Sequence, residues 1–149
     1  MVKNFAQPRA REAILSRLRN LRADSPRLWG KMSAPQMVCH LGDSFRCVMG
    51  ERPVTADYRR SLKWPALYFP IRWPRGVDTR PEIDPLIGGT KPSDFAGDMA
   101  SLVRLLQRIV SHTPDFTWQP HPIFGHLSQW QWMRWAYLHT DHHLRQFGH

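Results

Sequence analysis

Cysteine is scarce in this sequence of 149 residues, which contains only Cys39 and Cys47. The two lie eight positions apart in a segment that is predicted below to be helical, which separates them by about 12 Å along the helix axis. That separation excludes a disulfide bond between them. The sequence also lacks the apolar stretch of a signal peptide near its start, where Arg and Glu occur instead. We therefore expect a cytoplasmic protein that folds without disulfides.

Long apolar runs are missing as well, and no stretch approaches the ~18 residues that are needed to cross a bilayer. The sequence thus predicts a protein that does not span a membrane. Hydrophobic residues nevertheless make up 42% of the chain, which is enough for a conventional core. Because the length is also typical of one domain, we expect a single domain over residues 1–149.

Acidic residues are few: 12 Asp and Glu stand against 21 Lys and Arg, for a formal net charge of +9. A charge of this size can attract nucleic acid or another polyanion. The basic residues are scattered, however, and no run of about five or six of them occurs, nor any RNA-binding signature. Nucleic-acid binding is therefore not favoured, and a non-catalytic basic module that binds polyanions is kept as an alternative function.

Apolar residues recur at intervals of three and four in four segments, which is the pattern of amphipathic helices. Two of these segments open with a capping box, Ser33 with Gln36 and Ser128 with Gln131. A third is predicted to be capped by Ser93. The predicted helices span residues 8–21, 33–50, 93–112 and 128–147. The inward stripe of the first helix comprises Ala10, Ile14, Leu18 and Leu21, and that of the second comprises Met37, His40 or Leu41, Ser44 and Val48. The inward stripe of the third helix comprises Phe95, Met99, Leu102, Leu105 or Leu106, and Ile109.

The segment between the second and third predicted helices, residues 51–92, holds seven of the thirteen prolines and several aromatic residues. Loops of this length are usually functional or packed by their own side chains. We expect a packed Pro-rich crossover with a short helix around Ala56–Trp64. Four amphipathic helices with one long connection match known bundle topologies, so the predicted fold class is all-α, a four-helix bundle.

Four of the eight histidines lie at the end of the fourth predicted helix. His139 and His143, at i and i+4, stand on one face, from which two imidazoles can converge on one ion. His139 and His142, at i and i+3, form an alternative pair that the spacing does not exclude. A third ligand must come from another helix, and His40 is the only histidine of the second helix, at or beside its inward face. The pattern is compatible with a metal site between the second and fourth helices, and a pair of ordinary surface or core histidines is the alternative.

Three other polar residues are assigned roles from their positions relative to this site. Asp43 follows His40 by three positions and can orient a ligand imidazole or act as a general base, and a plain surface aspartate is the alternative. His121 and His126 precede the fourth helix, so we expect them about 20 Å from the site, in structural roles.

Three stretches of the sequence carry a family resemblance: residues 29–41, with Trp29-Gly30-Lys31-Met32-Ser33, Gln36-Met37 and His40-Leu41; residues 92–95 (PSDF); and residues 121–148, with HPIFG at 121–125, Leu127-Ser128 and HTDHHLRQFG at 139–148. They resemble the DinB/YfiT-like metalloenzyme superfamily. The resemblance covers most of the chain except residues 51–91.

Members of that superfamily are four-helix bundles with a long crossover after the second helix, in which three histidines bind a divalent metal ion such as nickel or zinc. For this sequence the resemblance implies His40, His139 and His143 as the ligands. Three neutral imidazoles leave a coordination position open, as in catalytic sites, where water or a thiol can be activated. Because the superfamily includes thiol-dependent transferases, the implied function is a metal-dependent enzyme for a small-molecule substrate, with a low-molecular-weight thiol as a further cofactor. A metal-dependent hydrolase is the alternative, and a homodimer is a further expectation.

Overall fold

The computed structural model describes residues 2–69, 72–111 and 116–149, which form helices and connecting loops. The elements in chain order are α1 (Pro8–Asn20), α2 (Ala34–Val48), a 3-10 turn η1 (Arg60–Leu62), α3 (Lys63–Tyr68), a second 3-10 turn η2 (Pro81–Ile83), α4 (Phe95–Val110) and α5 (Gln129–Gln146). No strand occurs in the described residues, where the only extended pairing is an isolated bridge between His121 and Gly125. The all-α prediction is therefore confirmed.

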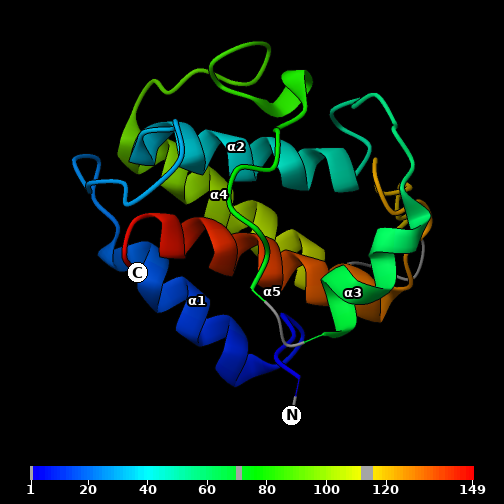
Figure 1. The fold of residues 1–149 in the computed structure, drawn as a ribbon. Helices are drawn as coiled ribbons and strands as arrows, with labels where there is room; N and C mark the ends of the chain where they lie inside the picture. Colours follow the sequence, from blue (N-terminus) through cyan, green and yellow to red (C-terminus); the bar gives the residue numbers. More distant parts are fainter. Residues whose placement is uncertain (1, 70–71, 112–115) are drawn as a thin grey trace.

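The four long helices α1, α2, α4 and α5 pack side by side, with α2 against α4 and α1 against α5 (Figure 1). The inward stripes of α1, α2 and α4 are those that the periodicity predicted. The buried residues include Ala10, Ile14, Leu18, Leu21, Met37, Leu41, Ser44, Val48, Leu102, Leu105, Leu106 and Ile109, while Phe95 and Met99 are partly buried against them.

The helix starts follow the predicted caps, with one exception. Ser33 and Gln36 form a reciprocal capping box at α2, and Ser128 and Gln131 form one at α5. At α4 the predicted cap, Ser93, is wrong by one residue, because the carboxylate of Asp94 accepts the Gly97 amide at 2.9 Å. Aspartate satisfies a free helix amide as well as serine does. The helix ends at Val110, and the predicted end near His112 lies outside the described residues.

The short helix of the crossover lies later than predicted, at Lys63–Tyr68 instead of residues 56–64. The amides of Asp57 and Arg59 donate to the carbonyls of Pro122 and Ile123 at 2.9 and 2.8 Å, so this stretch is extended along another segment. An amide that bonds a distant carbonyl cannot also complete a helical turn. A long-range contact thus overrides the local preference here.

None of the helices in the part of the chain that the structure describes is long and apolar enough to pass through a bilayer.

Candidate metal centre

Three histidine side chains from two helices meet at one point. His40 comes from the middle of α2, and His139 and His143 come from successive turns of α5. The Nε2 atom of His139 lies 3.2 Å from Nε2 of His40 and 3.1 Å from Nε2 of His143. One nitrogen from each of the three rings lies within 4.8 Å of the other two. The trio expected from the sequence is thus brought together.

The outer nitrogens of two of these rings decide which way their lone pairs point. His40 Nδ1 lies 2.8 Å from the carbonyl oxygen of Ile83, which can only accept, so this nitrogen carries the proton. His143 Nδ1 lies 3.0 Å from Oε1 of Gln146, whose amide nitrogen donates to the Trp29 carbonyl at 2.9 Å. A neutral imidazole has one N–H and one lone pair. The Nε2 atoms of His40 and His143 therefore both present lone pairs to His139.

Hydrogen bonding within the trio cannot satisfy this arrangement. His139 Nε2 can donate its single proton to one neighbouring lone pair at most, which leaves the other close contact between two acceptors. Nδ1 of His139 is buried and has no partner among the described residues. A cation between the three rings removes the conflict, because all three Nε2 atoms can then donate electron pairs to it.

The separations also suit a shared ion. Two nitrogens that bind one ion at about 2.1 Å, at angles from square to tetrahedral, lie roughly 3.0 to 3.4 Å apart. The contacts of His139 with His40 and with His143, 3.2 and 3.1 Å, fall in this interval. The third separation, between the ligand nitrogens of His40 and His143, lies within 4.8 Å. The three residues present can therefore hold a divalent metal ion.

Burial keeps the three rings uncharged. Desolvation lowers the pKa of His40, and it lowers the pKa values of His139 and His143 well below the ordinary range. For His139 and His143, neighbouring histidines lower the pKa further. Neutral imidazole is the form that binds metal, so the lone pairs are available near pH 7.

The trio opens into a cavity of about 390 Å³. Apolar and aromatic side chains dominate its walls. They come from α2, from α5, from the loop before α5 and from the crossover, whose contribution includes Leu62, Pro65, Ala66, Trp73, Val77 and Ile83. The indole N–H of Trp73 donates to the Ala66 carbonyl at 2.8 Å, which fixes this side chain within the crossover. The Pro-rich crossover is thus one wall of the site.

His142, the alternative partner for His139, lies beside the trio and not in it. Its ring packs edge-on against Trp29, with the centroids 4.8 Å apart, and its Nδ1 has no partner among the described residues. The three nitrogen atoms that converge belong to His40, His139 and His143. His142 contributes to the cavity wall instead.

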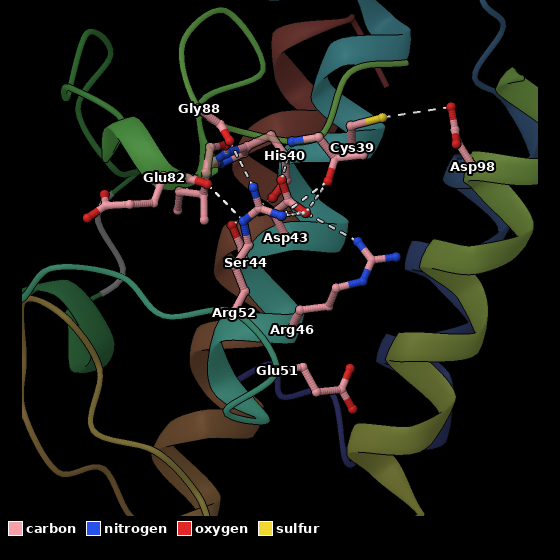
Figure 2. Close-up of polar contacts among 12 residues, drawn as sticks. Cys39, His40, Asp43, Ser44, Arg46, Glu51, Arg52, Glu82, Gly88 and Asp98 are labelled. Atoms are coloured by element: carbon pink, nitrogen blue, oxygen red, sulfur yellow. Dashed lines mark hydrogen bonds and ion pairs between the residues drawn. The ribbon is translucent and has the colours of Figure 1, made fainter. Parts of the chain in front are cut away.

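Asp43 is fully buried, which contradicts the surface alternative. Its carboxylate accepts the amide and hydroxyl of Thr90 at 2.7 and 2.8 Å and one nitrogen each from Arg46 and Arg52 at 3.2 Å (Figure 2). In the described part of the chain, no imidazole is among the hydrogen-bond partners of Asp43. The group that orients His40 is the Ile83 carbonyl, a backbone atom that no sequence pattern marks.

His121 lies on the wall of the same cavity, so the expected separation of about 20 Å is wrong. That distance assumed that the chain runs straight into the last helix. Instead, it reverses at residues 121–125, where the amides of His121 and Gly125 each donate to the other's carbonyl at 2.9 Å and Gly125 adopts a φ of +72°. The Nδ1 atom of His121 accepts the amides of Ile123 and Phe124 at 3.1 and 3.2 Å, so the residue stabilises this turn.

The helices and the three converging histidines define an all-α protein with a candidate site for a divalent metal ion. A family model matches residues 9–149, and the chain belongs to that family, which is described as a protein of unknown function (DUF1569). Neither the comparison with curated proteins nor the comparison with solved structures found a match.

Proposed function

We propose that this protein is a divalent-metal-dependent enzyme whose metal ligands are His40, His139 and His143. The observation that carries the proposal is the orientation of His40 and His143. Hydrogen bonds to Ile83 and Gln146 place the protons of these two rings on Nδ1, so that both Nε2 lone pairs point at His139. In this proposal the four long helices form a bundle of the DinB-like type, and residues 1–149 are one domain of that superfamily. Nickel and zinc are the ions that the resemblance favours.

A catalytic role is preferred over a purely structural one for two reasons. Structural sites are usually closed by four protein ligands, whereas three imidazoles leave a position open. The trio also lies on the wall of a cavity, where a small molecule can approach it. A bound divalent ion would supply Lewis acidity and would favour the deprotonated form of a water or thiol ligand.

The cavity walls suit a small and largely apolar substrate, because apolar and aromatic groups bind such molecules by excluding water. We propose an external low-molecular-weight thiol as the co-substrate of a transferase reaction. The two thiols of the protein itself are poor nucleophiles: burial raises the pKa of Cys39 to about 12 and that of Cys47 to about 11. Both therefore remain protonated at neutral pH.

The test of the metal site is elemental analysis of the untagged protein, followed by titration with nickel and zinc. We expect one equivalent of metal in the wild type and none in His40→Ala or His139→Ala. The matched control is His126→Ala, since His126 is an exposed loop residue. If the wild type binds metal and His40→Ala binds it equally, the proposed ligand set is wrong. The proposed site is also wrong if the wild type binds neither nickel nor zinc.

The thiol step is tested on the cobalt-substituted protein, because thiolate ligands give intense charge-transfer bands. We expect such bands when a low-molecular-weight thiol is added to the wild type. A cobalt spectrum that does not change on addition of thiol would overturn the transferase assignment and leave hydrolysis as the reaction to assay.

A further inference from the structure

The carbonyl of Ile83 orients His40, although it lies 43 positions away in the chain. It belongs to η2, in the crossover, so the orientation of a ligand on α2 depends on where this loop is held. An outer partner of this kind fixes the tautomer and direction of a metal-ligating imidazole. The question is what holds the Ile83 carbonyl in place.

The loop around Ile83 is closed tightly upon itself. The amide of Gly88 donates to the Pro81 carbonyl at 3.0 Å, and that of Gly89 donates to the Asp84 carbonyl at 2.7 Å. A Cβ atom on Gly89 would lie 2.9 Å from the carbonyl carbon of Ile83, so only glycine fits behind this peptide group. Residues 81–90 therefore behave as one compact unit.

Arg52 fastens this unit to α2 with all three nitrogens of its guanidinium group (Figure 2). Nε donates to the Glu82 carbonyl at 2.8 Å, and Nη2 donates to the Gly88 carbonyl at 2.9 Å. Nη1 donates to the buried Asp43 carboxylate at 3.2 Å. One planar group thus joins both ends of the loop to a carboxylate on the helix that carries His40.

We propose that Arg52 is a positioning residue of the metal site, which holds the Ile83 carbonyl against His40 Nδ1 and so keeps the His40 Nε2 lone pair directed at His139. This inference rests on the proposed metal-dependent function. Asp43 serves as the anchor on α2, since its second oxygen accepts the Thr90 amide at the far end of the loop. The charge of Asp43 stabilises the guanidinium, but the carbonyl contacts carry the effect on His40.

Arg46 provides a matched control. It donates to the same oxygen of Asp43 at the same 3.2 Å but to no carbonyl of the loop among the described residues. Replacing either arginine by methionine removes one partner of Asp43 and keeps an unbranched side chain. Only Arg52→Met also releases the Glu82 and Gly88 carbonyls. If Arg52 only neutralises Asp43, then Arg52→Met and Arg46→Met should have equal effects. If Arg52 positions the loop, the two substitutions should have unequal effects.

The first measurement is NMR of the metal-free protein with 15N-labelled histidine, which reports the tautomer of His40 directly. We expect a single Nδ1–H tautomer in the wild type and in Arg46→Met, and a mixture of tautomers in Arg52→Met. The second measurement is the Kd for zinc, which we expect to rise by about 10- to 100-fold in Arg52→Met and to stay unchanged in Arg46→Met. Should Arg52→Met fail to fold, Arg52→Lys is measured instead, because one ammonium group beside Asp43 cannot also reach both carbonyls.

Equal effects of the two methionine variants, or an unaltered His40 tautomer in Arg52→Met, would overturn the positioning role. The two readouts also separate this inference from the proposed function. If no variant binds zinc but only Arg52→Met changes the tautomer, the proposed metal-dependent function fails while the placement of His40 by Arg52 stands.

Discussion

Gln146 offers the sharpest single perturbation of the site, because it is not a ligand and yet sets the tautomer of one. Its side chain is only 3% exposed and bridges two groups: it donates to the Trp29 carbonyl at 2.9 Å and accepts from His143 Nδ1 at 3.0 Å. Gln146→Met removes both hydrogen bonds while retaining a side chain of similar length. His143 is then free to turn or to move its proton to Nε2.

The magnitudes follow from these two contacts. Each hydrogen bond contributes about 1 kcal/mol to folding, so the free energy of unfolding should fall by about 2 kcal/mol. For a domain of this size that corresponds to a decrease in Tm of roughly 4–8 °C. Loss of the outer partner of a metal-ligating histidine should also weaken metal binding by about 10- to 100-fold.

The assay pairs thermal unfolding of the metal-free protein with a zinc-binding titration. Gln131→Met is the control, since Gln131 also accepts one amide, that of Ser128 at 2.9 Å, but lies at the start of α5. We expect it to lower Tm without changing the Kd for zinc. If Gln146→Met lowers Tm as expected and binds zinc as tightly as the wild type, the tautomer argument for His143 is refuted.

Two further predictions concern histidines outside the trio. His142→Ala should retain one equivalent of zinc, because its ring packs on Trp29 beside the converging nitrogens; loss of zinc in this variant alone would assign the ligand role to His142 instead of His143. The metal-free protein should lose stability as the pH falls from about 6.5, the pKa of an unfolded histidine, towards about 3, to which burial lowers the pKa of His121. In this interval the unfolded chain binds more protons, so His121 contributes up to about 1.4 kcal/mol per pH unit. Urea unfolding at a series of pH values should give a shallower slope for His121→Asn than for the wild type, and equal slopes would contradict this assignment.

The parts of the fold that sequence analysis predicted correctly depend on interactions within a few residues. A capping box joins residues three positions apart, and the boxes of Ser33 with Gln36 and Ser128 with Gln131 both form. The apolar periodicity of each helix likewise needs only the geometry of a single helix. The cap of α4 at Asp94 was missed because two neighbouring residues, Ser93 and Asp94, can both serve and their local signals are alike.

The candidate site shows the same division. The spacing of His139 and His143 by one helical turn is visible in the sequence, as is the single histidine of α2. The packing of α2 relative to α5 brings His143, and not His142, into the trio. Both lie one turn after His139, so periodicity alone leaves the two alternatives open.

By itself, the sequence determined the helical class, the capping boxes of two helices and a histidine pair with the spacing of metal ligands, because each of these follows from contacts between near neighbours. Only the tertiary structure decided that the Ile83 carbonyl orients His40, that Asp43 is buried under the crossover, and that His121 lies on the cavity wall. These features join segments that are far apart in the chain. They depend on how a long, proline-rich loop packs against the helices, which no local pattern of residues specifies.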